Sequence, residues 1–298
     1  MKRLLLLLAA AAVIGAAALW QLSAVSRVDP SLVEGLRGDV ARGELAFNLG
    51  GCASCHAPPD VRGEGRLVLS GGRKIASPFG TFLVPNISPD PVNGIGSWSN
   101  LDFVNAMVFG TGRDGQHLYP AFPYTSYRRA AIGDIVDLKA YMDTLPAISV
   151  PSQPHELPFP FNIRRSLGLW KLMFLRSGWV MNDDALSPLE LRGRELVEGL
   201  GHCGECHTPR NILGGAKTGQ WLQGAPNPSG KGRIPDLTPH VGGLEWSAAD
   251  IAEYLTSGFT PEFDTAGGEM ADVVENISKL PAEDRTAIAA YLKALPGR

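Results

Sequence analysis

The chain contains the pentapeptide Cys-x-x-Cys-His twice, and these two copies constrain its fold and chemistry more than any other feature. They are Cys52-Ala53-Ser54-Cys55-His56 and Cys203-Gly204-Glu205-Cys206-His207. In this signature the two thiols form thioethers with the vinyl groups of c-type haem, and the histidine binds the iron. The copies account for all four cysteines, so none remains for a disulfide. The sequence therefore predicts two covalent haems (heme c), attached through Cys52, Cys55, Cys203 and Cys206 and ligated by His56 and His207.

Cysteine pairs with this spacing also occur in thiol redox sites and in zinc sites. Neither chemistry requires a histidine directly after the second cysteine, whereas both copies have one. Two redox dithiols, or one four-cysteine zinc site, are therefore the weaker interpretations.

The sequence around the two motifs is repeated as well. Cys203 follows Cys52 by 151 residues, and 298 residues are enough for two domains of ordinary size. Upstream of the motifs, Arg42-Gly43-Glu44-Leu45-Ala46-Phe47 matches Arg192-Gly193-Arg194-Glu195-Leu196-Val197. Each segment predicts a short helix whose small glycine allows close packing against another helix.

The match continues downstream of the motifs. Four further segments correspond in pairs: Pro85-Asn86-Ile87-Ser88-Pro89 with Pro235-Asp236-Leu237-Thr238-Pro239, and Trp98-Ser99 with Trp246-Ser247. An aspartate three residues after each Trp-Ser serine predicts a helix start, and Gly110 and Gly258 predict the helix ends. Closing helices are predicted at 134–145 and 283–295. The pattern indicates a domain duplication rather than a short repeat.

The N-terminus has the pattern of an export segment. Met1-Lys2-Arg3 is followed by seventeen consecutive apolar residues, from Leu4 to Trp20. This run is longer than an ordinary signal core and approaches the length that spans a bilayer. An uncleaved anchor within residues 1–26 is favoured, while Ala24-Val25-Ser26 is a tolerable signal-peptide cleavage site. The rest of the chain is expected outside the cytoplasm, held at the membrane if the anchor is kept.

These features together resemble class I cytochrome c. The resemblance rests on a helix leading into Cys-x-x-Cys-His, a long loop with Pro-Asn-Ile-Ser-Pro, a helix opened by Trp-Ser and a last helix ending in Ala-Tyr-x-x-x-Leu-Pro. The tandem arrangement is similar to the cytochrome subunits of periplasmic alcohol, aldehyde and sugar-acid dehydrogenases. It implies an all-α fold with two tandem class I cytochrome c domains and long ordered loops, at 36–147 and 187–298, plus an N-terminal transmembrane helix or signal segment. The resemblance also implies a location in the periplasm, at the inner membrane if the anchor is kept.

Residues 148–186 form a linker of different composition. Five prolines between Pro146 and Pro160 predict an extended segment. From Phe161 to Trp179, large apolar residues alternate with four basic residues, which predicts an amphipathic helix. A strap packed over the two domains is the favoured interpretation. Contact with a membrane surface or with a partner protein is the alternative.

The iron held by His207 needs a sixth ligand, which in electron-transfer cytochromes is commonly a methionine sulfur. Met270 lies twelve residues after Gly258, in the glycine-containing loop Thr265-Ala266-Gly267-Gly268-Glu269-Met270-Ala271. Its position also matches the ligand loop of the family that the chain resembles. We therefore expect His207 and Met270 to ligate the second haem.

The first haem lacks an equivalent methionine. Twelve residues after Gly110 stands Phe122, which cannot bind iron. Some similar loops carry a methionine a few residues later, where this chain has Ala130 and Ala131. The remaining donors nearby are His117, Tyr119, Met107 and Met142. Core packing is the favoured role of the two methionines, while ligation by His117 and an iron without a protein ligand both stay open.

The site chemistry favours electron transfer over catalysis. With 27 basic against 30 acidic residues and no basic run after the first three, the chain is not expected to bind nucleic acid. The expected function is to carry electrons, and the resemblance implies a quinoprotein or flavoprotein dehydrogenase as donor and a terminal oxidase, a quinone or a soluble cytochrome as acceptor. A dihaem peroxidase or other small-molecule oxidoreductase with an open first haem is the alternative, and a ligand sensor would lack a recognisable output domain.

Overall fold

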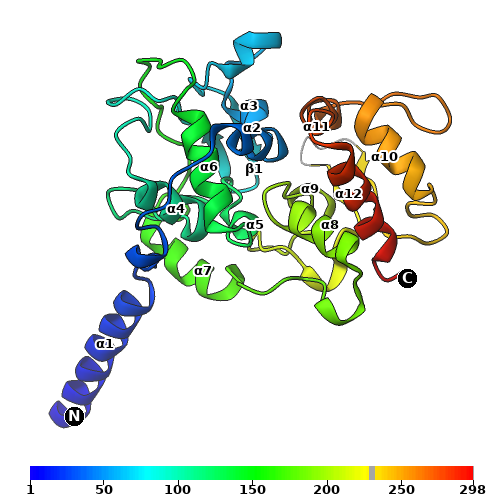
Figure 1. Ribbon diagram of the computed structural model, residues 1–298. Helices are drawn as coiled ribbons and strands as arrows, with labels where there is room; N and C mark the ends of the chain where they lie inside the picture. The colour runs from blue at the N-terminus through cyan, green and yellow to red at the C-terminus, as the bar shows by residue number, and fades with distance from the viewer. Residues whose placement is uncertain (228–231, 298) are drawn as a thin grey trace.

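The computed structural model describes residues 1–227 and 232–297 and shows a mostly helical protein from which one long helix projects (Figure 1). The projecting helix is α1 (Lys2–Leu22). The first half of the remaining chain, up to residue 147, contains α2 (Val40–Leu49), α3 (Cys52–His56), α4 (Asn100–Phe109), α5 (Tyr124–Tyr127) and α6 (Ile132–Met142). The linker contains α7 (Leu167–Phe174). The second half, from residue 187, contains α8 (Pro188–Glu198), α9 (Gly204–His207), α10 (Ala248–Ser257), α11 (Glu269–Ile277) and α12 (Ala282–Ala294). Short 3-10 helices are η1 (Pro30–Leu32), η2 (Gly63–Leu67), η3 (Arg164–Ser166), η4 (Asp183–Ala185) and η5 (Thr218–Gln220).

Two short antiparallel hairpins accompany the helices. The first pairs β1 (Lys74–Ser77) with β2 (Gly80–Leu83), and the second pairs β3 (Ala225–Pro226) with β4 (Arg233–Ile234). Each hairpin begins 22 residues after the first cysteine of its haem motif, so the hairpins belong to the repeat. The all-α expectation does not include them, because strands this short carry no alternating pattern that periodicity can detect.

The predicted start and end signals of α4 and α10 are confirmed, while the closing helices expected at 134–145 and 283–295 are observed as α6 and α12, at 132–142 and 282–294. The Ser99 hydroxyl accepts a hydrogen bond from the Asp102 backbone N–H, and the Asp102 carboxylate accepts one from the Ser99 N–H, which is a capping box at α4. Ser247 and Asp250 form the same box at α10. Gly110 ends α4 in the left-handed conformation (φ 57°), and the equivalent glycine ends α10 in the same way (φ 79°).

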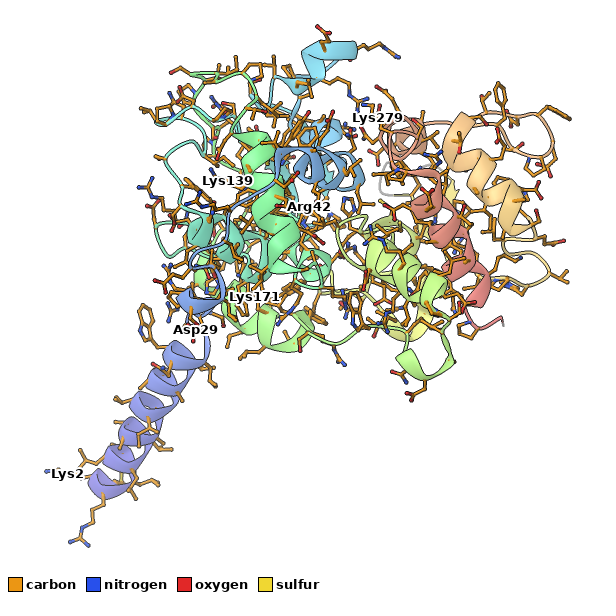
Figure 2. All side chains as sticks on the ribbon, in the orientation of Figure 1. Lys2, Asp29, Arg42, Lys139, Lys171 and Lys279 are labelled. Carbon is orange, nitrogen blue, oxygen red and sulfur yellow. The ribbon has the colours of Figure 1, made fainter. Side chains whose placement is uncertain are left out.

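Each half is built on a pair of helices that approach closely at a glycine. In the first half α2 packs on α6, and a Cβ atom on Gly43 would lie 2.0 Å from the carbonyl oxygen of Asp137. In the second half α8 packs on α12, and a Cβ atom on Gly193 would lie 2.0 Å from the carbonyl oxygen of Ala287. Arg42 of α2, labelled in Figure 2, also pairs with the buried Asp137 (Nε to Oδ2, 2.7 Å). The predicted close packing at these glycines is confirmed.

The buried apolar side chains form two main clusters. The first is centred on α2, α4 and α6, and the second on α8, α10 and α12. The clusters meet at the boundary between the halves, since Leu200 of the second half belongs to the first cluster and Leu45 and Leu49 of α2 pack against the second. The two halves therefore share an apolar contact in addition to the linker.

The proline-rich part of the linker is extended, as predicted. Residues 146–160 contain no helix, and Glu156 exchanges two backbone hydrogen bonds with Thr81 of β2 (2.9 and 3.0 Å). This contact holds the linker along the first hairpin.

The following segment, for which a strap over the two domains is the favoured interpretation, contains α7. α7 covers only the middle of the predicted helix, 161–179. Its buried Lys171 donates a hydrogen bond to the carbonyl of Gly110 in the first half (2.8 Å), and Trp170 Nε1 donates one to the carbonyl of Leu213 in the second (2.8 Å). α7 therefore packs across both halves.

α1 points away from the rest of the protein, with Lys2 at its far end (Figure 2). None of its residues is buried, and it is long and apolar enough to cross a membrane. These properties suit a membrane anchor and a signal peptide alike.

Candidate haem sites

The first Cys-x-x-Cys-His motif forms α3, directly after α2. Gly51 joins the two helices in the left-handed conformation (φ 56°), which allows the sharp change of direction. The Nδ1 atom of His56 lies 2.9 Å from the carbonyl oxygen of Pro85. Because a carbonyl only accepts, Nδ1 carries the proton and Nε2 keeps its lone pair. Burial lowers the pKa of His56 to about 4, so the ring is in the neutral form that binds a metal.

His207 repeats this arrangement at the end of α9. Its Nδ1 atom lies 2.9 Å from the carbonyl oxygen of Pro235, and burial lowers its pKa below the ordinary value. Pro85 and Pro235 begin the two matching proline-rich loops, so each repeat places a carbonyl acceptor beside its histidine ring. The sequence indicates the loops but not this contact, since His56 and Pro85 are 29 positions apart.

A glycine close to each proline-rich loop donates a hydrogen bond to the haem-motif histidine. The N–H of Gly71 donates to the carbonyl of His56 (2.8 Å), and the N–H of Gly224 donates to the carbonyl of His207 (2.8 Å). Both glycines have positive φ (72° and 74°). A Cβ atom on Gly71 would lie 2.4 Å from the carbonyl oxygen of Val84, directly before the first proline. A larger residue would therefore push the loop away from the histidine.

The residues of both motifs fit c-type haem. Each histidine presents an unprotonated Nε2 from a ring whose other nitrogen is held in place. The four cysteines form no disulfide. Among residues 1–227 and 232–297, no group of three or more His, Cys, Asp or Glu side chains lies close enough to hold a metal ion.

The two motifs lie close together across the boundary between the halves. Although the Cys206 thiol reaches solvent, crowding by protein raises its pKa to about 11, and the charges of Glu269, Glu205 and Cys55 add to this effect. Burial also raises the pKa of Tyr127, with contributions from cysteines of the first motif and from Glu205 of the second. Each motif is therefore within electrostatic reach of the other.

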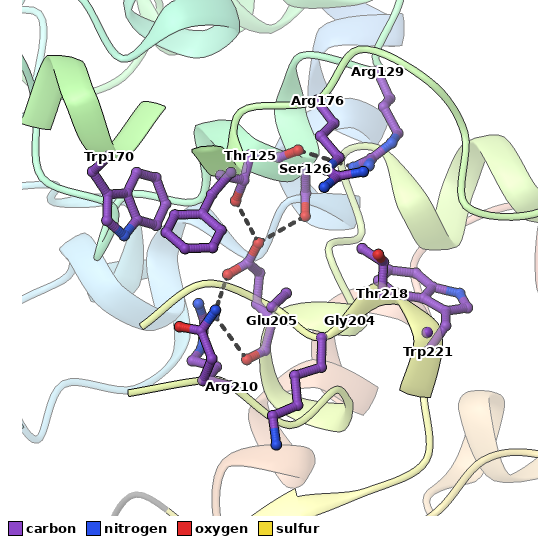
Figure 3. A pocket seen from close by; sticks show the side chains of 15 residues that line it. Thr125, Ser126, Arg129, Trp170, Arg176, Gly204, Glu205, Arg210, Thr218 and Trp221 are labelled. Atoms are coloured by element: carbon purple, nitrogen blue, oxygen red, sulfur yellow. Dashed lines mark hydrogen bonds and ion pairs between the residues drawn. The ribbon is translucent and has the colours of Figure 1, made fainter. Parts of the chain in front are cut away.

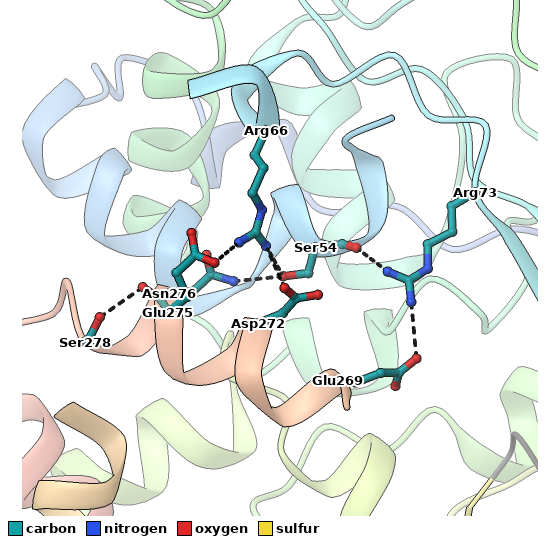
Figure 4. A network of polar contacts seen from close by, with 8 residues as sticks. All are labelled: Ser54, Arg66, Arg73, Glu269, Asp272, Glu275, Asn276 and Ser278. Atoms are coloured by element: carbon teal, nitrogen blue, oxygen red, sulfur yellow. Dashed lines mark hydrogen bonds and ion pairs between the residues drawn. The ribbon is translucent and has the colours of Figure 1, made fainter. Parts of the chain in front are cut away.

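A polar network joins α3 to α11 (Figure 4). The hydroxyl of Ser54, in the middle of the first motif, accepts hydrogen bonds from Asn276 Nδ2 (2.8 Å) and from Arg66 Nη2 (3.1 Å). The buried Arg66 also forms an ion pair with Glu275 (Nη1 to Oε2, 2.5 Å). Arg66 thus holds the second half against the first motif.

The second motif is joined to the first half through Glu205 (Figure 3). Its carboxylate accepts hydrogen bonds from the hydroxyls of Thr125 (2.8 Å) and Ser126 (2.9 Å) and pairs with Arg210. Burial alone would raise the pKa of Glu205, but Arg210 and the two hydroxyls hold it below its ordinary value. These residues line a cavity of about 320 Å³ between the halves. Each motif is therefore fixed to the opposite half.

Met270 lies in the first turn of α11, half-buried against the second apolar cluster. The expectation of a loop at this position is wrong, because Gly268 (φ 57°) ends the loop and the helix begins at Glu269. Glu269 pairs with Arg73 (3.3 Å), whose other Nη atom donates to the carbonyl of Ser54 (2.7 Å). The helix with the candidate ligand of the second haem thus also touches the motif of the first. Ligation by Met270 stays a prediction.

Hydrogen bonds fix the register of the two candidate ligand loops. The N–H of Leu118 donates to the carbonyl of Gly110 (2.7 Å). The N–H of Ala266, 148 residues after Leu118, donates to the carbonyl of Gly258 (2.8 Å). Phe122 and Met270 each follow four residues further on. The final helices α6 and α12 start 150 residues apart, so the second half has two extra residues before α12.

Phe122 lies in an aromatic cluster. Its ring centre is 5.4 Å from that of Tyr127 and 6.4 Å from that of Tyr124. The predicted core role of Met107 and Met142 is confirmed, since both are buried in the first apolar cluster. Tyr119 donates its hydroxyl hydrogen to the carbonyl of residue 161 (2.9 Å). These candidate donors are therefore engaged elsewhere.

His117 is buried with both ring nitrogens engaged. Its Nε2 lies 2.9 Å from the carbonyl oxygen of Ser23, and its Nδ1 lies 3.1 Å from Nζ of Lys171. Because the carbonyl accepts and the lysine donates, the proton is on Nε2 and the Nδ1 lone pair is occupied. The structure therefore argues against His117 as an iron ligand.

Known proteins include several chains similar to this one. A dihaem c-type cytochrome of Cereibacter sphaeroides is 58% identical over 282 residues, which cover 95% of this chain and 94% of the relative. A fructose dehydrogenase cytochrome subunit of Gluconobacter japonicus is 37% identical, and the cytochrome c subunit of a quinone-type alcohol dehydrogenase of Gluconobacter oxydans is 35% identical. These two alignments cover 91% and 86% of this chain but 55% of each relative, so the chain spans about half the length of those subunits. No protein-family model matches the chain.

Proposed function

This chain belongs to the dihaem c-type cytochromes, and from this membership we propose that it carries electrons from a periplasmic dehydrogenase toward the respiratory chain. The cytochrome subunits of fructose and alcohol dehydrogenases among its relatives support a quinoprotein or flavoprotein dehydrogenase as donor. The acceptor is a terminal oxidase, a quinone or a soluble cytochrome. The peroxidase alternative finds no support, because these relatives are cytochromes and cytochrome subunits of dehydrogenases and the surroundings of Phe122 are aromatic.

In this proposal the side chains of the two motifs hold the haems. A bound haem supplies a one-electron carrier whose potential depends on its axial ligands and its exposure. His56 and His207 bind iron through Nε2, and the proline carbonyls fix their rings. Met270 completes the second site, whereas the first site presents Phe122 at the same register. The covalent attachment residues are Cys52 and Cys55 for the first haem and Cys203 and Cys206 for the second.

The closeness of the two motifs carries the proposal. Electron transfer between two centres benefits from a short and constant separation. The contacts of Ser54 with Asn276 and of Glu205 with Thr125 fix each motif to the opposite half. The chain's own residues therefore favour passage of electrons from one haem to the other within a single molecule.

We assign residues 36–147 and 187–298 to two class I cytochrome c domains, with 148–186 as their linker and 1–26 as the anchor. Support comes from the two apolar clusters, the two helix pairs and the matching hairpins. Val28 and Val33 also belong to the first cluster, so the folded unit begins before residue 36. Residue 298 lies outside the described residues.

We infer that α1 is kept as an anchor, which places the protein on the periplasmic side of the inner membrane. The chain that follows α1 is built into the first half. The buried Ser23 accepts the hydrogen bond from His117, and the Thr111 hydroxyl donates to the carbonyl of Ser26 (2.8 Å). Cleavage after Ser26 would remove Ser23 and leave the Nε2–H of the buried His117 without its acceptor.

Respiration of membranes from the native host tests the proposed function. Oxygen consumption is measured with alcohols, sugars and sugar acids as electron donors, in a strain without this gene and in the complemented strain. We expect loss of respiration with at least one of these substrates and unchanged respiration with NADH. Equal rates with every substrate in the two strains would overturn the proposal.

A further inference from the structure

α7 presents apolar side chains on its outward face as well as toward the protein. Leu167, Gly168 and Lys171 of one face are buried against the protein. On the opposite face lie Leu169, Leu172 and Met173, at helical spacing, and the latter two are 62% and 48% exposed. A surface helix of a soluble protein normally turns a polar face to water. The outward face of α7 therefore needs an apolar partner.

The segment before α7 has the same character. Three further large apolar side chains are exposed there: Phe159, Phe161 and Ile163. Basic residues accompany them in the sequence, at positions 164, 165 and 176, while no acidic residue occurs between Glu156 and Asp183. Exposed apolar side chains next to basic ones are typical of segments that lie in a membrane interface.

This segment lies beside the end of α1. The guanidinium of Arg165 stacks over the ring of Trp20 (4.1 Å to the ring centre) and donates to the Ser23 hydroxyl (2.9 Å). A Cβ atom on Gly168 would lie 2.3 Å from the Ser23 carbonyl oxygen, so α7 touches the chain that leaves α1. Figure 1 shows α7 along the edge from which α1 emerges.

We propose that the exposed strap face, made of Phe159, Phe161, Ile163, Leu172 and Met173, rests on the lipid bilayer beside α1. This inference depends on the membrane anchoring proposed above. The bilayer is the partner that the position selects, because the contact of Arg165 with Trp20 holds the strap at the level where α1 meets the aqueous phase. With α1 in the bilayer and the strap face on its surface, the protein touches the membrane at two neighbouring places. It therefore cannot tilt freely about α1, and both haem motifs keep a fixed height above the membrane.

Spin labels on introduced cysteines test this face in the full-length protein with its haems. The four native cysteines are bonded to haem in the proposed state, so an added cysteine is labelled alone. The labelled variants are Leu172→Cys and Met173→Cys on the strap, Val241→Cys on the second half, where the side chain is 92% exposed, and Leu8→Cys in α1. Each is placed in vesicles of phosphatidylethanolamine and phosphatidylglycerol. Collisions of the label with oxygen, which concentrates in lipid, and with a water-soluble nickel chelate are measured by electron paramagnetic resonance.

We expect an oxygen-to-nickel collision ratio several-fold higher at residues 172 and 173 than at 241. A lipid signal at residue 8 together with equal ratios at 172 and 241 would overturn the strap contact and leave the anchor intact. A water signal at residue 8 would overturn the anchor, and with it the strap contact. Protection of residue 172 from both reagents would show that protein covers this face, which would also reject the bilayer as its partner.

Discussion

Replacing Gly43 with alanine tests whether the close approach of α2 to α6 supports the first haem motif. The new Cβ atom would lie 2.0 Å from the carbonyl oxygen of Asp137 and 2.8 Å from Cβ of Tyr141. Such atoms prefer separations of about 3.5 Å, so the helices must part locally by about 1.5 Å. Overpacking costs about 1–3 kcal/mol, and alanine recovers up to about 1 kcal/mol through its helix propensity. We expect the free energy of unfolding to fall by about 1–2 kcal/mol, because the clash is with backbone.

Guanidinium unfolding of the haem-loaded protein, followed by circular dichroism and by haem absorption, measures this change. Gly133→Ala is the matched control, since it adds a Cβ atom to α6 with nothing within 4 Å. The control should be neutral or slightly stabilising. Gly193→Ala should resemble Gly43→Ala, because its Cβ atom would meet the Ala287 carbonyl oxygen at the same 2.0 Å. Equal stability of Gly43→Ala and Gly133→Ala would refute the reasoning.

The remaining predictions concern the haems and one buried lysine. Cys52→Ala and Cys203→Ala should each weaken haem attachment at their own site and leave the other haem bound, as measured by mass spectrometry; loss of both haems from either variant would contradict two separate sites. Met270→Leu should lower the potential of one haem and remove the methionine sulfur from its iron, as followed by potentiometric titration and magnetic circular dichroism. The core variant Met107→Leu should change neither property. Two unaltered haems in Met270→Leu would reject Met270 as an iron ligand. Cyanide or carbon monoxide should bind one haem per chain, and an absence of binding would point to a further protein ligand at the first haem. Burial lowers the pKa of Lys171 from its ordinary 10.5 to about 7. Between these pH values the unfolded chain binds more protons than the folded chain, so the free energy of unfolding should rise with pH. Lys171→Met should reduce that slope in denaturant titrations between pH 7 and 10, and an unchanged slope would speak against the lowered pKa.

The parts of the fold that depend on neighbouring residues could be predicted from the sequence. Ser99 with Asp102, and the glycine that ends α4, are short-range signals whose chemistry determines the conformation. The role of Gly43 followed from its position in a repeated helix, where a small residue allows close approach. Both haem motifs are likewise contiguous, so their chemistry could be inferred directly.

Contacts between distant residues could not be predicted in this way. Ser54 and Asn276 are 222 positions apart, and nothing in their local sequence pairs them. His117 in a loop pairs with Lys171 in the strap, 54 positions away. Because the sequence does not reveal this contact, it leaves His117 as a candidate iron ligand. At Met270, the preceding Gly267-Gly268 favoured a loop, but the helix begins directly after the second glycine. Local propensity indicates where a turn occurs and leaves its length to tertiary packing.

The position of Arg66 has a consequence for protein engineering. Its side chain is only 10% exposed, and its carboxylate partners Asp272 and Glu275 belong to the other half of the chain. A cut through the linker would turn this interior contact, and the apolar contact of Leu200, into new surface on each fragment. Single-haem fragments would then expose charged and apolar groups that the intact chain covers. If one half is fused to another cytochrome, that cytochrome has to supply partners for the residues that the removed half covers.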